Sequence, residues 1–234
     1  MPYSASATAI NLFEYAFNID GAFASPLLGA TVPAGVNLAG FDTDTGLGTI
    51  LVSVVGTGAH FVGLFVDHEI DEEENTFFNE VGDTGGSPAA NQSWEIDEPG
   101  FCDTNVTPGC HLGDIYDNFQ LSDETGSALD NSIGTLNPED VSMAMGWNFS
   151  LVQNQTALIK FLVATTAPAS GFYLRQADPD SLDDSGALAP VDIYLSSTID
   201  FRSGGTGVPE PATLALLGIG LLGLWQTHRR QAVM

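Results

Sequence analysis

A long alternation of large apolar residues with small or polar ones, over residues 141–151, constrains the fold most strongly. The large residues occupy every second position: Val141, Met143, Met145, Trp147, Phe149 and Leu151. Since successive side chains of a β-strand point to opposite faces, this pattern predicts a sandwich strand with one face in the core. Residues 157–165 repeat the alternation, and the only lysine, Lys160, falls on the outward face.

Further short strands are predicted between turns rich in Gly, Pro, Asn and Asp. They cover residues 10–20, 47–55, 61–70, 94–96, 171–175 and 191–201, with another short element at 115–121. Gly56-Thr57-Gly58 is typical of a hairpin turn, and residues 21–40 and 82–92 are predicted as irregular chain. No convincing amphipathic helix is found. We therefore predict an all-β fold, an antiparallel β-sandwich of jelly-roll type.

The C-terminal tail differs in composition from the rest of the chain. It contains a Val-Pro-Glu-Pro element, an apolar run over residues 212–225 and a basic end. Prolines keep a helix from starting earlier, and a helix over 212–225 would be about 21 Å long, shorter than the roughly 30 Å apolar core of a bilayer. The basic end follows the positive-inside rule. The motif residues are Val208, Pro209, Glu210, Pro211, Arg229 and Arg230.

The tail closely resembles the PEP-CTERM sorting signal of Gram-negative bacteria that make exopolysaccharide. The resemblance covers about the last tenth of the chain and rests on the order and spacing of the three parts. It implies a short membrane helix, transient membrane insertion, and removal of the tail by an exosortase at the inner membrane. It also implies delivery to the cell surface or an exopolysaccharide matrix. The body is similar to an uncharacterised group of PEP-CTERM proteins, which implies no activity.

Four parts are expected along the chain. Residues 1–9 are a remnant of an export signal, 10–203 a β-sandwich ectodomain, 204–207 a flexible linker and 208–234 the sorting tail. Residues 7–9 form a small-x-small element of the kind that signal peptidase cuts, without a basic and apolar leader before it. We therefore expect the true start upstream and Ile10 as the first mature residue.

The formal net charge of −25 excludes several partners. Before the tail, 29 acidic residues face only Lys160, Arg175 and Arg202, a net charge of −26. Nucleic acid and anionic lipid are repelled by such a surface, while cations are attracted.

Six carboxyl groups within residues 67–74 form the densest acidic segment. Their repulsion has to be relieved by solvent, by raised pKa values or by a cation, and Ca²⁺ is the cation that such clusters outside the cell most often meet. The ligands predicted for Ca²⁺ are Asp67, Glu69 and Asp71. A second candidate is Asp42 with Asp44, where an ordinary Asx turn is the alternative. A solvated acidic face and a carboxylate pair for glycoside hydrolysis remain open interpretations.

Cys102 and Cys110 enclose a short loop with a Thr-Pro-Gly turn, which predicts a disulfide in an exported chain, with free thiols as the alternative. Sequence motifs of serine hydrolases, zinc peptidases and phosphate loops are missing, so no catalytic residues are predicted. We expect a non-enzymatic surface or matrix protein, and the alternative is a secreted carbohydrate-active hydrolase or a carbohydrate-binding module. An enzyme would show a cleft with convergent carboxylates, one with a raised pKa.

Overall fold

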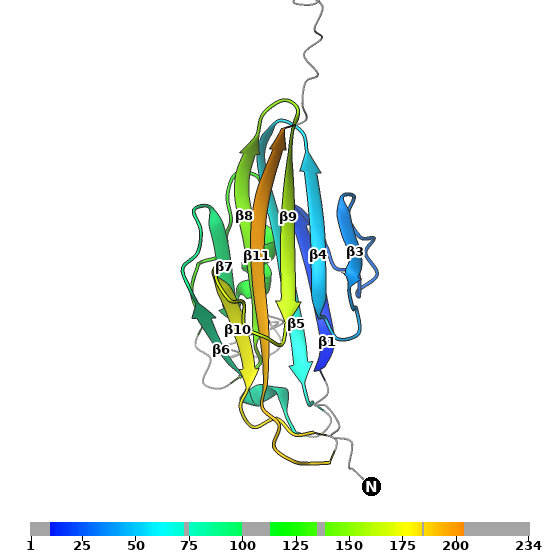
Figure 1. Cartoon of the computed structure of the whole chain (residues 1–234), viewed down its shortest axis with the longest axis vertical. Coiled ribbons are helices and arrows are strands. Elements are labelled where there is room, and N and C mark those ends of the chain that lie inside the picture. The colour runs from blue at the N-terminus through cyan, green and yellow to red at the C-terminus, as the bar shows by residue number, and fades with distance from the viewer. Residues whose placement is uncertain (1–9, 73–74, 100–112, 135–138, 184, 204–234) are drawn as a thin grey trace, which may run out of the picture. The chain divides into compact units, whose positions relative to one another are not determined.

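The computed structural model describes residues 10–72, 75–99, 113–134, 139–183 and 185–203. The chain divides into two compact units, Met1–Arg202 and Ser203–Met234. The described part of the first unit is a sandwich of two antiparallel sheets (Figure 1), so the predicted β-sandwich is confirmed. No helix within the described residues is long and apolar enough to cross a membrane. The predicted tail helix, the motif residues and both cysteines lie outside the described residues.

Each sheet mixes strands from both halves of the chain. Sheet A contains, in spatial order, β2 (Ala22–Ala24), β1 (Ile10–Ile19), β5 (Gly58–Ile70), β8 (Ser142–Leu151) and β7 (Gln92–Asp97). Sheet B contains β3 (Val36–Phe41), β4 (Gly48–Val55), β9 (Gln155–Ala164), β11 (Val191–Ser203), β10 (Tyr173–Asp178) and β6 (Val81–Gly85). The helical segments of the described residues are η1 (Phe77–Asn79) and α1 (Ile115–Leu121).

The chain passes between the sheets at two similar turns. β4 belongs to sheet B and β5 to sheet A, so the turn between them joins strands that do not pair. β8 and β9 are joined in the same way, and because β4 pairs with β9 and β5 with β8, the two turns lie side by side (Figure 1). The hairpin predicted at Gly56-Thr57-Gly58 is therefore wrong. β4 and β5 instead face each other across the core, each with its apolar side inward. In a hairpin, both strands would lie in the same sheet.

The main core lies between the sheets and follows the predicted alternation. Alternate residues of β8 and β9 point into it, and Lys160 is exposed as predicted. Trp147 is buried there, and its Nε1 donates a hydrogen bond to Ser197 Oγ at 2.8 Å.

A second, smaller core covers the outer face of sheet A. Phe65 of β5 packs there against Tyr116 and Phe119 of α1, with ring centroids 5.4 and 6.0 Å apart. Residues 115–121 thus form a helix that the sequence pattern did not identify. The short apolar face of α1 is stabilised by this packing more than by its length, since a helix of seven residues is marginal alone.

The outward faces of β1 and β8 are also covered, although the alternation over residues 141–151 predicted only one face in the core. Glu14 and Asn18 of β1 and Ser142 of β8 are buried, because the segment that carries α1 folds back over sheet A. Asn18 Nδ2 donates to the carbonyl oxygens of Phe119 and Ser122, each at 2.7 Å. The side chain therefore satisfies carbonyl groups that the end of α1 leaves free.

Three short strands lie in segments that were predicted as irregular chain. β2 falls within residues 21–40, β3 begins there and ends one residue beyond at Phe41, and β6 begins at Val81 and runs into 82–92. All three occupy the edges of their sheets. Edge strands pair on one side only, and these three short sequences carry little of the apolar alternation that marks the central strands.

Candidate functional site

Four carboxyl groups gather on the outer face of sheet A. Glu14 of β1 lies directly opposite Asp67 of β5, and Asp67 lies opposite Ser142 of β8. Glu69 follows Asp67 by two residues and therefore shares its face of the sheet. Asp140 precedes β8, and its charge reaches both Asp67 and Glu69. We call Glu14, Asp67, Glu69 and Asp140 the carboxylate group.

Hydrogen bonds hold one oxygen of two of these carboxyl groups and leave the other without a partner. The Tyr116 hydroxyl donates to Glu14 Oε1 at 3.0 Å, and the Ser142 hydroxyl donates to Asp67 Oδ1 at 2.8 Å. The buried oxygens of the carboxylate group that have no partner are Glu14 Oε2, Asp67 Oδ2, Glu69 Oε2 and Asp140 Oδ1. Unpaired buried oxygens of this kind cost free energy unless a proton or a cation satisfies them.

Burial and nearby negative charge raise the pKa values of Asp67, Glu69 and Asp140. Burial, followed by the charge of Asp140, raises the pKa of Asp67 well above its usual range. The same two causes raise the pKa of Glu69 to about 8. Burial and the charge of Glu72 raise the pKa of Asp140 to about 6. Without a cation, Glu69 therefore holds a proton at neutral pH.

Asp71, the third predicted Ca²⁺ ligand, lies elsewhere. Its backbone has a positive φ of 49°, and its Oδ2 accepts a hydrogen bond from Leu182 N at 2.5 Å. Asp71 interacts with Asp178. Burial and the charge of Asp71 raise the pKa of Asp178 to about 7. The structure thus keeps Asp67 and Glu69 together and places Asp71 in a separate pair with Asp178.

The second predicted site is an exposed Asx turn. Asp42 Oδ1 accepts hydrogen bonds from the backbone N–H groups of Asp44 at 2.9 Å and Thr45 at 3.4 Å. These bonds lower the pKa of Asp42. Gly46 N donates back to Asp42 O at 2.9 Å and closes the turn. The predicted alternative, a turn that leads into β4, therefore describes this segment.

A further acidic group, formed by Glu95, Asp97 and Asp114, was not predicted. Each residue offers an oxygen within 4.8 Å of the others. Both Glu95 oxygens and Asp97 Oδ2 already accept hydrogen bonds, from Asn118, from the N–H of Asp130 and from the N–H of Asp114. These neighbours come from separate segments of the chain, so no local sequence pattern could identify the group.

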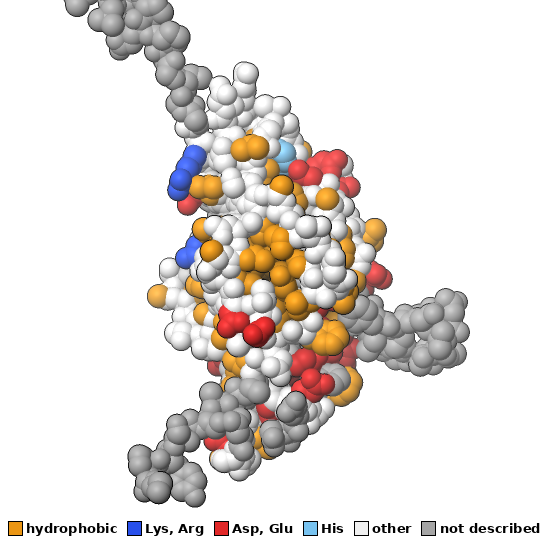
Figure 2. Space-filling view, turned by 90° about the vertical axis from the view of Figure 1, so that its right-hand side faces the viewer, with side chains coloured by type: hydrophobic (Ala, Val, Ile, Leu, Met, Phe, Trp, Pro, Cys, Tyr) orange, Lys and Arg blue, Asp and Glu red, His pale blue; other side chains and the backbone are white. Residues whose placement is uncertain are grey.

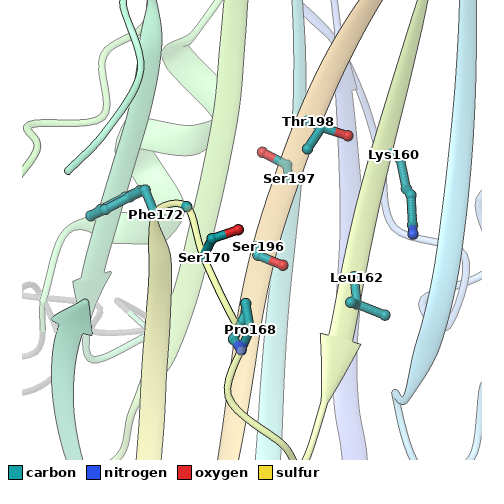
Figure 3. A pocket seen from close by; sticks show the side chains of 9 residues that line it. Lys160, Leu162, Pro168, Ser170, Phe172, Ser196, Ser197 and Thr198 are labelled. Atoms are coloured by element: carbon teal, nitrogen blue, oxygen red, sulfur yellow. The ribbon is translucent and has the colours of Figure 1, made fainter. Parts of the chain in front are cut away.

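Two adjoining cavities open on the outer face of sheet B. The smaller cavity has a volume of about 210 Å³. Figure 3 shows Lys160 and Leu162 of β9 on one side of it, Pro168 of the loop between β9 and β10 on the other, and Ser196 of β11 between them. The second has a volume of about 380 Å³. Its polar lining comes from Asn37, Ser53, Lys160, Thr198, Asp200 and Arg202. The carboxylate group does not line either cavity.

Charge is unevenly distributed between the two faces of the sandwich. Two of the three basic residues that precede the tail, Lys160 and Arg202, line the larger cavity. The third, Arg175, forms ion pairs with Asp83 and Asp192 at 2.6 and 2.7 Å. Figure 2 shows one side of the molecule, where the basic side chains lie along one edge and acidic side chains form several separate patches.

Comparison with known proteins supports the interpretation of the tail. Residues 207–230 match the PEP-CTERM protein-sorting motif. No curated protein and no solved structure matches the chain. The motif covers the tail alone, so the sandwich has to be interpreted from its own geometry.

Proposed function

We propose that this PEP-CTERM protein, which is exported and sorted by an exosortase, is a non-enzymatic component of the surface or exopolysaccharide matrix of a Gram-negative bacterium. The sorting motif at residues 207–230 carries the proposal. The motif determines where the chain is delivered and does not indicate what the sandwich binds. The tail inserts into the membrane transiently, and an exosortase removes it.

Replacement of the motif tests the sorting step. Changing Pro209, Glu210 and Pro211 to alanine should leave the sandwich folded, because the motif belongs to the second compact unit. We expect the variant to keep its tail and stay with the membrane, which mass spectrometry and fractionation would measure. Normal processing of this variant would contradict the role of the tail.

The exopolysaccharide part of the proposal is supported by the larger cavity on sheet B. Its volume of about 380 Å³ lies in the range of ligand sites, and its lining combines hydroxyl and amide groups with two basic side chains. Lys160 and Arg202 bring two of the three basic residues of a strongly acidic ectodomain to one place. An acidic polysaccharide, which the rest of the surface repels, fits this face.

Co-sedimentation of the full chain with alginate, an acidic polysaccharide, tests this contact. Changing Lys160 and Arg202 together to glutamine should weaken binding by roughly fivefold, the effect of two exposed charge contacts. Arg175→Gln is the control for loss of a positive charge outside the cavity. Equal binding of the double variant and the wild type, or equal binding to uncharged dextran, would contradict the proposal.

The alternative of a hydrolase is tested by the same material. A glycoside hydrolase needs two carboxyl groups that flank a substrate in a cleft. The carboxylate group, in contrast, lies under α1 with Glu14 and Asp67 only 1% exposed. We expect no release of reducing sugar from the polysaccharide, and measurable release would favour the hydrolase.

A further inference from the structure

The two cavities on the outer face of sheet B are parts of one groove. Lys160 of β9 and Thr198 of β11 line both of them, so the cavities meet at these two side chains. The smaller cavity, of about 210 Å³, lies below the roughly 300 Å³ at which separate ligand sites begin. It is therefore an extension of the larger cavity, and we call the two together the sheet B groove.

The sheet B groove follows the direction of β11. Alternate residues of a strand share one face, and the groove is lined by an alternating row of β11 residues: Ser196, Thr198, Asp200 and Arg202. A strand rises about 3.3 Å per residue, so the row from Ser196 to Arg202 is about 20 Å long. Figure 3 shows Lys160 and Leu162 of the neighbouring strand β9 alongside the lower part of this row. A groove of this length accommodates several linked sugar rings.

Polar side chains along the groove are available to a ligand. Lys160 and Arg202 are exposed, and neither forms an ion pair with another described residue. The hydroxyl groups of Ser170, Ser196 and Thr198 likewise form no hydrogen bond within the part of the chain that the structure describes. A ligand can therefore bind these groups without breaking an existing bond, which would cost free energy.

The two cavities of the groove differ in charge. The larger one contains Arg202 and Asp200 in addition to Lys160. Among the described residues that line the smaller one, Lys160 is the only charged side chain, and it lies at the junction. The rest of the smaller cavity combines hydroxyl groups with the apolar side chains of Leu162 and Pro168. A sugar ring, with hydroxyl groups around an apolar C–H face, fits such a lining whether or not it is charged.

We propose that the sheet B groove binds an extended segment of several sugar units along β11, an inference that rests on the proposed binding of an acidic polysaccharide. The larger cavity and Lys160 hold an acidic unit, because both basic side chains lie there. The smaller cavity holds a following ring through the Ser170 and Ser196 hydroxyls and the apolar surface of Leu162. Affinity therefore depends on the length of the sugar chain as well as on its charge.

Binding of the full chain to alginate oligosaccharides of defined length, measured by calorimetry, tests the inference. We expect a hexasaccharide to bind at least about tenfold more tightly than a disaccharide, because only the longer chain occupies both cavities. Equal affinities would overturn the inference and leave the proposed function standing, since the charge contacts in the larger cavity would remain. Absence of binding by both oligosaccharides and by the alginate polymer would overturn the two proposals together.

A bulky substitution tests the smaller cavity separately. Ser170→Trp fills this cavity from the loop between β9 and β10, and it should lower the affinity for the hexasaccharide about tenfold while leaving the affinity for the disaccharide unchanged. Thr166→Trp is the matched control, because Thr166 is exposed on the same loop and lines neither cavity. Wild-type affinity of Ser170→Trp for the hexasaccharide, or an equal loss for both oligosaccharides, would contradict the assignment.

Discussion

Glu80 joins three segments of the sandwich through one side chain. Its Oε1 accepts from the N–H of Ile70 at 3.3 Å, and its Oε2 accepts from Val141 N at 3.2 Å and from Gln176 Nε2 at 2.6 Å. It is fully buried, and burial raises its pKa to about 10. The folded protein therefore keeps a proton on Glu80 at neutral pH, whereas the unfolded chain releases it near pH 4.5.

This difference predicts that stability falls as pH rises. Because the folded state binds one proton more than the unfolded state between about pH 4.5 and 10, the contribution is complete below pH 4.5 and is lost progressively toward pH 10. Each such group contributes a slope of at most about 1.4 kcal/mol per pH unit. Glu80→Gln should flatten the slope, which urea unfolding in EDTA at pH 5, 7 and 9 would measure. Glu124→Gln should keep the full slope, and an unchanged slope in Glu80→Gln would contradict the role of Glu80.

At single positions, alternation predicted the core faces of the strands well and the outer face of sheet A poorly. Trp147 and Lys160 point as their patterns indicate. Glu14 and Asn18 lie on the face of β1 opposite its core residues and are nevertheless buried. The pattern of a strand shows which residues share a face, but the layer that covers that face comes from a distant part of the chain. A polar residue under such a layer looks, in sequence, like a solvated one.

Two paired glycines leave room for α1 to pack on sheet A. Gly63 of β5 lies opposite Gly146 of β8, and their missing side chains leave room for aromatic rings. A Cβ atom at Gly63 would lie 2.6 Å from Phe119 and 3.0 Å from Phe61. Both rings are fully buried and cannot move aside freely.

Gly63→Ala should therefore destabilise the protein by about 1–3 kcal/mol, since it forces extra volume into a packed layer. Urea unfolding would measure the free energy. Gly126→Ala is the control, because a Cβ there meets no atom within 4 Å, and it should change stability by no more than about 0.5 kcal/mol. Equal stability of Gly63→Ala and the wild type would show that α1 does not pack on the Gly63–Gly146 pair as described.

Among the elements, the long central strands were predictable, and the connections between them were not. Gly56-Thr57-Gly58 has the composition of a hairpin turn, yet it carries the chain from sheet B to sheet A. Turn residues determine how tightly the backbone reverses. Which sheet the next strand joins depends on pairing partners far along the chain, such as β9 for β4 and β8 for β5.

At the scale of the whole molecule, the sequence identified the sorting motif and two of the four members of the carboxylate group. Asp67 and Glu69 lie in the dense acidic segment that was singled out, whereas Glu14 and Asp140 join them only through the pairing of β1, β5 and β8. Asp71, which was predicted with them, accepts a hydrogen bond from Leu182 N and interacts with Asp178, at a point where the chain turns with a positive φ. The Cys102–Cys110 disulfide stays a prediction. A high local density of acidic residues indicates that their repulsion has to be relieved. The pairing of the strands decides which carboxyl groups lie together.

The position of β11 in sheet B has a consequence for how the molecule is made. β11 is the last strand of the sandwich to be synthesised, and it lies between β9 and β10. A chain that ends before Val191 leaves both neighbours with open edges, which invite aggregation. Such a chain also lacks the motif at residues 207–230. Truncated translation products would therefore neither complete the sandwich nor carry the sorting motif. Because β11 directly precedes the motif in the chain, incomplete copies are kept from the cell surface.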